Sequence, residues 1–182
     1  MVHFNFNQDK AVNALLLILN ELRQSDFHKL FKILYFADRK HLKRYGNPII
    51  GDEYISMENG PVPSNIYDLL KFANNRTTFS PFKEFFGQYS STVNVQSYMV
   101  TATKKSNIDY LSETDIECLM ESIHENKDLN FKQLKDKSHD LAWKRPDPQL
   151  NTIDFLKMAE AEGADKATLH YIAENSENMV LF

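Results

Sequence analysis

Glycine and proline residues cluster between positions 48 and 63, in a segment that separates two stretches with a helical pattern. The cluster consists of Pro48, Gly51, Gly60, Pro61 and Pro63. Proline fixes φ and lacks a backbone N–H donor, while glycine reaches left-handed backbone conformations without a steric penalty. The same segment carries large apolar side chains, namely Ile49, Ile50, Tyr54, Ile55 and Met57. We therefore predict an ordered loop over residues 47–63, packed down by those side chains and held in few conformations.

The stretches on both sides of this loop are predicted to be helices. Apolar residues recur at helical spacing over residues 9–24 and spread around most of the circumference, which places a first helix near the centre of the core. A second helix is expected to follow Ser25 or Asp26 as its N-cap and to stop at Gly46. A third helix is expected to begin with Ser64 as its N-cap.

A small β element is predicted after the third helix. Residues 85–88 and 93–103 alternate in polarity and are rich in β-branched and aromatic residues, so we expect two strands with a turn at residues 88–92. Ser112 then begins a capping-box pattern that predicts a fourth helix, and Asn130 opens a short fifth one.

Residues 138–143 are predicted to form a tight helical corner. Asn151 with Asp154 is expected to start a sixth helix that ends at Gly163, and a last helix follows from residue 165 to about residue 174. The chain contains no internal repeat and no low-complexity tract.

These elements predict a mainly α protein of the α+β class. We expect a compact bundle of about six or seven helices, with a small β-hairpin or sheet inserted after the third helix. The chain has 182 residues, 42% hydrophobic and 25% charged, which suits one globular domain with a sizeable core. Residues 1–148 are expected to form the body, and residues 149–182 a C-terminal helical extension packed on the same domain.

The overall charge and the cysteine content exclude several classes of protein. The formal net charge is −4, so general attraction to nucleic acid is not expected. Cys118 is the only cysteine, so no disulfide forms within the chain, and its apolar neighbours predict a small buried side chain. The N-terminus lacks a signal-peptide pattern, and the apolar run at residues 15–19 is too short to cross a bilayer. We expect a cytoplasmic protein without a membrane partner.

Asp38 and His41 stand out because Asp38 interrupts the apolar stripe of the second predicted helix. The two residues are three apart and therefore share a helix face. A carboxylate on an apolar stripe needs hydrogen-bond donors or a cation, because its burial without a partner is very costly. We favour an internal role, in which Asp38 accepts from backbone amides of the Gly60–Pro61 turn, or from Tyr54 or Tyr67. The alternative is that Asp38 faces a cleft and contacts a ligand or partner.

No other constellation indicates a catalytic or metal centre. His139 and Asp140 are adjacent and do not share a helix face, and the four-residue step from His139 to Trp143 is better explained by packing. The six histidines, at positions 3, 28, 41, 124, 139 and 170, form no His-x-x-x-His or His-Glu-x-x-His pair. We expect no metal site, no cofactor and no enzymatic activity.

Two groups of basic residues offer a further alternative. The first consists of Arg39, Lys40, Lys43 and Arg44, and the second of Lys132, Lys135, Lys137, Lys144 and Arg145. Such groups are usually solvated surface, although they could meet phosphate or an acidic protein surface. Because neither a nucleic-acid-reading motif nor interleaved aromatic residues accompany them, binding to nucleic acid is the less favoured interpretation.

Several motifs of the chain, taken together, resemble the Panacea domain of the SocA-like antitoxin family. The motifs are Leu34-Tyr35-Phe36-Ala37-Asp38, Tyr45-Gly46-x-Pro48, Gly51-Asp52-x-Tyr54, Gly60-Pro61-Val62-Pro63-x-x-Ile66-Tyr67, the Leu111-Ser112 helix start and the His139–Trp143 corner. The resemblance runs from about Leu30 to Trp143. It departs from the family at Phe31, where many relatives carry a glutamine, and we match nothing after about Pro148.

The resemblance implies a mostly helical domain with a small β element. It also implies an antitoxin that is encoded beside a toxin protein and neutralises this partner by direct binding. The candidate partner-binding or loop-organising residues are Asp38, His41, Asp52, Tyr54, Gly60, Pro61 and Tyr67.

Three alternatives to direct neutralisation stay open at this point. The chain could be an adaptor that delivers the toxin to a protease, with its C-terminal apolar residues engaging that protease. It could be a hydrolase that uses Asp38 and His41 as an acid–base pair. It could also be a transcriptional regulator that binds DNA through its basic groups, although no helix-turn-helix is recognisable.

Overall fold

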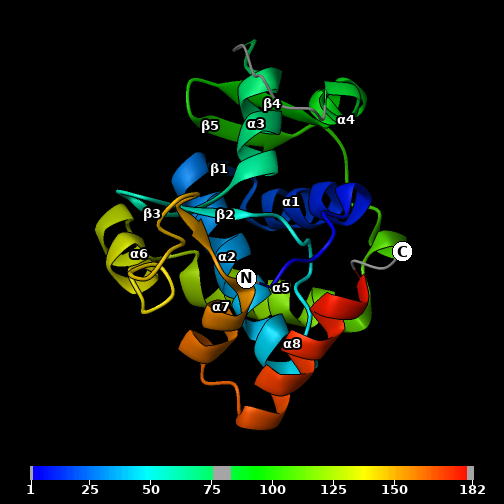
Figure 1. The fold of residues 1–182 in the computed structure, drawn as a ribbon. Coiled ribbons are helices and arrows are strands. Elements are labelled where there is room, and N and C mark those ends of the chain that lie inside the picture. Colours follow the sequence, from blue (N-terminus) through cyan, green and yellow to red (C-terminus); the bar gives the residue numbers. More distant parts are fainter. Residues whose placement is uncertain (1, 76–82, 180–182) are drawn as a thin grey trace.

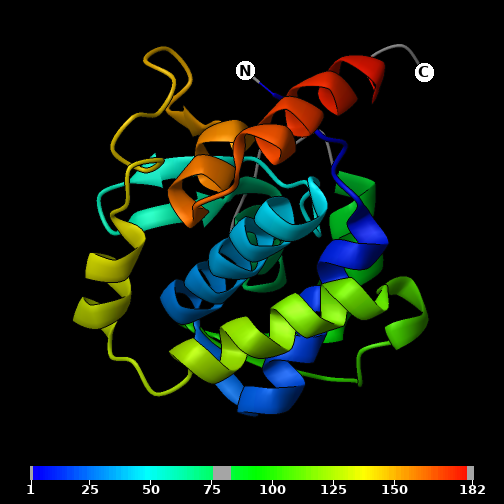
Figure 2. The same ribbon diagram turned by 90° about the horizontal axis from the view of Figure 1, so that it is seen from below.

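Helix α2 (Phe27–Tyr45) runs through the middle of the molecule, and most of the other helices pack against it (Figure 1, Figure 2). The computed structural model describes residues 2–75 and 83–179. Residues 30–39 are buried without interruption, so α2 contacts neighbours on all sides. Asp26 caps the first turn by accepting from the backbone N–H of Lys29 at 2.9 Å, and Gly46 ends the helix with a φ of 74°. Both predicted ends of the second helix are confirmed.

Helices α1 (Gln8–Leu22) and α5 (Glu113–Asn126) lie against α2 and enclose the larger apolar cluster with it. The first predicted helix is confirmed, with an end two residues earlier than expected. Helix α5 begins with the predicted capping box. The backbone N–H of Asp115 donates to the Ser112 hydroxyl at 3.1 Å, and the Asp115 carboxylate accepts from the backbone N–H of Ser112 at 2.8 Å.

Three further helices pack on α2 and form a second apolar cluster with it: α6 (Phe131–Ser138), α7 (Phe155–Glu162) and α8 (Lys166–Met179). The predicted start of α6 at Asn130 and the predicted end of α7 at Gly163 are confirmed. Asp154 caps α7, but Asn151 does not take part, because it lies in the preceding loop with a φ of 57°. Residues 180–182, which belong to the apolar C-terminus considered for a protease contact, lie outside the described residues.

Residues 138–143 do not form the predicted helical corner. Helix α6 ends at Ser138, and a turn follows it. The side chain of Asp140 accepts from the backbone N–H of Trp143 at 2.9 Å, which satisfies the turn locally without a helical ladder. Short polar side chains that bond their own backbone in this way compete with helix formation.

The first of two three-stranded antiparallel sheets has the order β1–β5–β4. Its strands are β1 (Gln24–Asp26), β4 (Val93–Gln96) and β5 (Met99–Ala102). The prediction of a strand at residues 85–88 is wrong, since these residues belong to helix α4 (Lys83–Tyr89). Phe86 and Tyr89 are both buried there at helical spacing. The hairpin lies wholly within residues 93–103, and the single-turn helices η1 (Ser90–Thr92) and η2 (Ile108–Tyr110) flank this region.

The second sheet has the order β3–β2–β6 and joins β3 (Gly60–Pro63), β2 (Tyr54–Met57) and β6 (Thr152–Ile153). Part of the predicted loop is therefore a β-hairpin. Strand β3 was not predicted, because its prolines cannot donate backbone hydrogen bonds to a β ladder. An edge strand such as β3 tolerates them. Helix α3 (Ser64–Ala73) follows β3 directly.

The fold is mainly helical with small sheets, so the predicted α+β class is confirmed. Within residues 2–75 and 83–179, no helix combines the length and the apolar character that crossing a membrane would require.

Candidate functional site

Asp38 is buried on α2 and fixes the loop that follows this helix. Its Oδ1 accepts hydrogen bonds from the backbone N–H groups of Ile49 and Ile50, at 2.7 and 3.3 Å, and its Oδ2 accepts from the Tyr54 hydroxyl at 2.8 Å. Tyr54 is one of the donors expected from the sequence. The two amides, however, come from the start of the loop and not from the Gly60–Pro61 turn.

Asp52 caps helix α3 from the same loop. Its Oδ1 accepts from the Ser64 hydroxyl at 3.2 Å and from the backbone N–H of Asn65 at 3.1 Å, and its Oδ2 accepts from the backbone N–H of Ile66 at 3.0 Å. The prediction of Ser64 as the N-cap is wrong, because Pro63 occupies that position. Proline has no side-chain acceptor, so the carboxylate of Asp52 satisfies the free N–H groups of the first turn instead.

Burial raises the pKa of both carboxyl groups. Desolvation raises the pKa of Asp38 to about 7, against the opposing effect of the hydrogen bonds from Tyr54 and the two amides. Desolvation likewise raises the pKa of Asp52 to about 6, although four groups donate to it. Through the hydrogen bonds that they accept, the two carboxyl groups order the backbone between α2 and α3.

His41 faces α5 and not Asp38. Its Nδ1 donates to the carbonyl oxygen of Asn47 at 2.6 Å, and its Nε2 lies 3.1 Å from Oγ1 of Thr114. Burial lowers the pKa of this imidazole. In the described part of the chain no hydrogen bond joins His41 to Asp38, and the two side chains contact different elements. The geometry therefore gives the acid–base alternative no shared site for proton transfer.

The His139–Trp143 corner is a packing unit, as its four-residue step indicated. The two rings stack with their centroids 3.6 Å apart and 6° between their planes. The Trp143 indole N–H donates to the carbonyl oxygen of Met57 at 2.9 Å, so the corner also holds the β2–β3 hairpin. Asp140 contacts α2 instead, where it pairs with Arg39 at 2.6 Å.

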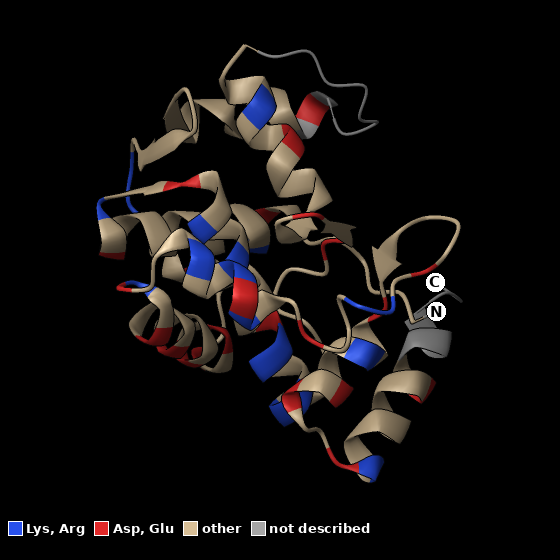
Figure 3. Ribbon diagram, turned by 90° about the vertical axis from the view of Figure 1, so that its left-hand side faces the viewer, with Lys and Arg blue, Asp and Glu red and all other residues tan. Residues whose placement is uncertain are grey.

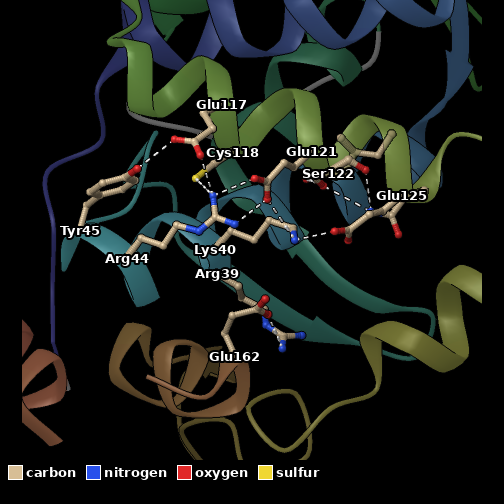
Figure 4. A network of polar contacts seen from close by, with 12 residues as sticks. Arg39, Lys40, Arg44, Tyr45, Glu117, Cys118, Glu121, Ser122, Glu125 and Glu162 are labelled. Atoms are coloured by element: carbon tan, nitrogen blue, oxygen red, sulfur yellow. Dashed lines mark hydrogen bonds and ion pairs between the residues drawn. The ribbon is translucent and has the colours of Figure 1, made fainter. Parts of the chain in front are cut away.

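The basic residues in the second half of α2 are mostly paired with carboxylates. Figure 4 shows Arg44 and Lys40 directed at the glutamates of α5, and Arg39 directed at α7. The ion pairs are Arg39–Glu162, Lys40–Glu125 and Arg44–Glu121, each at 2.7 Å. Figure 3 shows blue and red segments next to one another in the middle of the view. The first basic group is therefore largely neutralised within the protein, which removes most of its attraction for phosphate.

Cys118 and the histidines offer no reactive or metal-binding centre. Cys118 is buried, and burial raises the pKa of its thiol to about 11, so the thiolate is scarce at neutral pH. Over the described residues, no group of three or more His, Cys, Asp or Glu side chains is arranged to hold a metal ion.

The best candidate for a binding surface is a cavity of about 570 Å³ beside the first two turns of α2. On one side of it, the Tyr67 ring of α3 lies 6.2 Å from the Phe27 ring and 5.6 Å from the Phe31 ring, between centroids. On the other side, Phe131 stacks on His28 at 4.0 Å. We call this cavity the α2 groove, and it is defined by Phe27, Phe31, Lys32, Tyr67, Tyr98 and Phe131.

Lys32 lies at the floor of the α2 groove, where β3 covers it. Its Nζ donates to the carbonyl oxygen of Pro61 at 2.8 Å. Gly60 has a φ of 97°, and a Cβ at this position would lie 2.8 Å from Cε of Lys32 and closer still to the Ser138 hydroxyl. Only glycine allows the strand to approach the lysine in this way. The hairpin tip is held at the groove by Asn59, whose carbonyl oxygen lies 3.2 Å from Nε2 of His28.

The structure divides the predicted site residues into two sets. Tyr67 lines the α2 groove, and Gly60 and Pro61 contact its floor through Lys32. The remaining residues do not line it, and they are the buried side chains of Asp38, His41, Asp52 and Tyr54. A role of this second set in partner binding remains a prediction, and their contacts order the loop that leads to the groove.

Sequence reasoning missed Lys32, which is a buried lysine among the residues that line the groove. A signal was present, because Lys32 is the only charged residue in the run from Phe31 to Ala37. It also missed Tyr98 and Phe131, since these come from a hairpin turn and from the first turn of α6, and no local pattern joins them to α2.

Comparison with protein families identifies the chain over most of its length. The model of a family described as antitoxin SocA-like, Panacea domain, matches residues 30–144. These limits confirm the resemblance seen in the sequence, which runs from about Leu30 to Trp143. No curated protein and no solved structure matches the chain.

Proposed function

The chain belongs to the SocA-like antitoxin family with its Panacea domain, and from this we propose that it neutralises a toxin protein by binding it directly in the cytoplasm. The family match supports an antitoxin role. Direct binding is our extension of that role, and the α2 groove is the observation that carries it.

The α2 groove has the composition of a protein interface. Aromatic side chains supply large contact areas and are enriched among the residues that dominate binding energies. Phe131 is 52% exposed and Tyr98 is 59% exposed, and both lie at the mouth of the groove. A cavity flanked by such side chains is able to receive apolar residues of a partner.

The groove is also fixed before any partner arrives. Asp38 and Asp52 hold the loop between α2 and β2, and Trp143 holds the hairpin through the carbonyl oxygen of Met57. A surface that is already ordered loses less conformational entropy when it binds, so more of the contact energy appears as affinity. The buried polar residues thus support binding without touching the partner.

The test is co-expression with the protein encoded beside this chain. That protein alone should arrest growth, and co-expression should restore it. The purified pair should form a complex by size-exclusion chromatography and calorimetry. Phe131→Ala should weaken the complex at least tenfold, because it removes an exposed aromatic anchor. Leu150→Ala is the matched control, since Leu150 is 63% exposed and does not line the groove.

Two results would contradict direct binding. One is a purified chain that captures no neighbouring gene product. The other is neutralisation that persists when no complex forms, which would favour delivery to a protease. Toxin half-life in cells with and without this chain separates that alternative, because an adaptor shortens the half-life and a blocking antitoxin does not.

A further inference from the structure

Lys32 is a buried lysine that has, among the described residues, a single hydrogen-bond partner. The residue is 1% exposed, and its Nζ donates to the carbonyl oxygen of Pro61. An ammonium group carries three N–H donors, so two of them are left. Within residues 2–75 and 83–179, no carboxylate lies within ion-pair distance of this Nζ. Burial of a charge without a counter-ion is costly, and such a charge beside a cavity is typical of a site that another molecule completes.

The surrounding charges leave Lys32 uncompensated. His28 and His139 interact electrostatically with Lys32 and with Lys135, and Asp26 and Glu58 line the same cavity. The carboxylate of Asp26 is used to cap α2. Desolvation lowers the pKa of Lys32 to about 7, and burial together with the charge of Lys32 lowers the pKa of His28 to about 4. Both shifts follow mainly from burial.

Large apolar side chains make up much of the groove lining around this lysine. Phe31 and Tyr67 are in ring contact, Phe131 stacks on His28, and Met57 lines the same cavity. A volume of about 570 Å³ is within the usual range of ligand pockets. The complementary ligand therefore combines a negative charge with neighbouring apolar groups.

We propose that the α2 groove binds an acidic side chain of the toxin, Asp or Glu, that is flanked by apolar residues, and that Lys32 receives its carboxylate. The carboxylate supplies acceptors for the two remaining N–H groups, and the apolar neighbours cover the aromatic walls. This inference rests on the proposed function for the identity of the partner, but the chemistry of the site can be tested without the toxin.

The first test uses two small probes on the full chain. Hydrocinnamate carries a phenyl ring and a carboxylate, and hydrocinnamide is its neutral analogue. In NMR titrations, hydrocinnamate should shift resonances of Phe31, Val62 and Tyr67 and bind about tenfold more tightly than the amide, because its hydrogen bonds are charge-assisted. Equal affinities, shifts confined to another surface, or no binding of either probe at millimolar concentration would overturn the proposal.

The second test uses Lys32→Met, with Lys132→Met as the matched control. Lys132 is exposed on α6, one residue from the groove, and pairs with Asp136. Lys32→Met should abolish the preference for the carboxylate probe and also toxin neutralisation, whereas Lys132→Met should preserve both. If Lys32→Met loses the probe preference but still neutralises the toxin, the pocket serves a small acid and the proposal is overturned.

A measurement on the wild-type chain covers the case in which Lys32→Met does not fold. The Lys32 side-chain resonances report its pKa directly, and hydrocinnamate should raise this pKa while hydrocinnamide leaves it unchanged. An unchanged pKa in saturating hydrocinnamate overturns the site. If the wild-type chain neutralises its toxin but shows no carboxylate preference, this inference fails alone. If the groove prefers the carboxylate probe but the chain neutralises no toxin, the proposed function fails. The toxin is then also excluded as the molecule that fills the groove.

Discussion

Asp38 and Lys32 are two charged residues buried on the same helix, and the structure treats them in opposite ways. Asp38 accepts three hydrogen bonds, and each donor belongs to the loop or to β2. Lys32 makes one hydrogen bond, to the backbone of β3, and lies at the floor of a cavity. Buried polar groups are normally satisfied within the protein. The carboxylate of Asp38, which has three donors inside the protein, therefore has an internal role. The ammonium group of Lys32, which has one acceptor, is where we propose that a partner supplies further acceptors.

The largest effect is expected from Asp38→Ala. The substitution leaves the N–H groups of Ile49 and Ile50 and the Tyr54 hydroxyl without their acceptor inside the protein. We expect the free energy of unfolding to fall by about 3–5 kcal/mol, because each orphaned buried group carries its own desolvation penalty. Urea unfolding followed by circular dichroism measures it. Asp136→Ala, at an exposed carboxylate of α6, is the control and should leave stability unchanged. A loss of less than about 1 kcal/mol for Asp38→Ala would contradict the structural role of Asp38.

The next largest effect is expected from Gly60→Ala. Alanine disfavours a φ of 97°, and its Cβ would contact Cε of Lys32 and the Ser138 hydroxyl. We expect a loss of about 2–4 kcal/mol from backbone strain and overpacking together. Thermal unfolding monitors the change. Gly87→Ala is the matched control, because nothing lies within 4 Å of the position its Cβ would take, and it should not destabilise the protein. Equal stability of the two variants would contradict the close approach of β3 to Lys32.

A smaller effect with the opposite sign is expected from Lys32→Met. Replacement of a buried, poorly compensated cation by an apolar side chain of similar length should raise the free energy of unfolding by about 1–2 kcal/mol. Toxin neutralisation should be lost at the same time. Chemical denaturation of the isolated chain gives the first quantity and the growth assay gives the second. If Lys32→Met destabilised the protein as much as Asp38→Ala, both charged residues would have a structural role. The contrast drawn between Lys32 and Asp38 would then be wrong.

The last prediction concerns the dependence of stability on pH. Asp38 has a pKa of about 7 when folded and 3.8 as a model value, so the folded chain binds the proton more tightly. The part of its stability contribution that depends on this proton is complete below about pH 4 and is lost as pH rises through 7. The lowered pKa of Lys32 acts only above about pH 7. Between pH 5 and pH 7 the raised pKa values of Asp38 and Asp52 lower stability as pH rises, and the lowered pKa of His28 raises it. The comparison with Asp38→Asn isolates the first effect, because this variant should lose less stability with rising pH than the wild type. An unchanged slope in the variant would assign it to other groups.

Local signals predicted the helices well. Asp26 and Gly46 limit α2, Asp154 and Gly163 limit α7, and a capping box starts α5. In each case the residues that define a helix end are adjacent to it in sequence, and their preference is set by the N–H and C=O groups that a helix leaves free. The family resemblance also came from motifs that can be read locally.

The elements that sequence reasoning missed depend on distant partners. Strand β3 contains two prolines and is a strand only because β2 pairs with one edge. Residues 85–88 looked like a strand, but the fold buries Phe86 and Tyr89 on one side of a helix. The cap of α3 comes from Asp52, which is twelve positions before Ser64. No local sequence pattern predicts these three features, because the contacts that stabilise them form only in the folded chain.

The candidate site was predictable only in part for the same reason. Gly60, Pro61 and Tyr67 lie in recognisable motifs, and they do reach the groove or its floor. In the sequence, Lys32 stands out only as the one charged residue in the run from Phe31 to Ala37, and its position beneath β3 appears only in the folded chain. The far wall comes from Phe131, about a hundred residues further along the chain, so a surface built from both was not visible in the sequence.

Strand β6 has a practical consequence for anyone who wishes to shorten this protein. It pairs with β2 through Tyr54 opposite Ile153, and Asn151 adds hydrogen bonds to Ser56. The family match ends at residue 144, before this strand begins. A fragment that ends at residue 144 would lack β6, so one edge of β2 would be unpaired. The backbone N–H and C=O groups of that edge could then pair with other chains. Such a fragment should associate with itself, and its failure to protect a cell would then say nothing about the toxin.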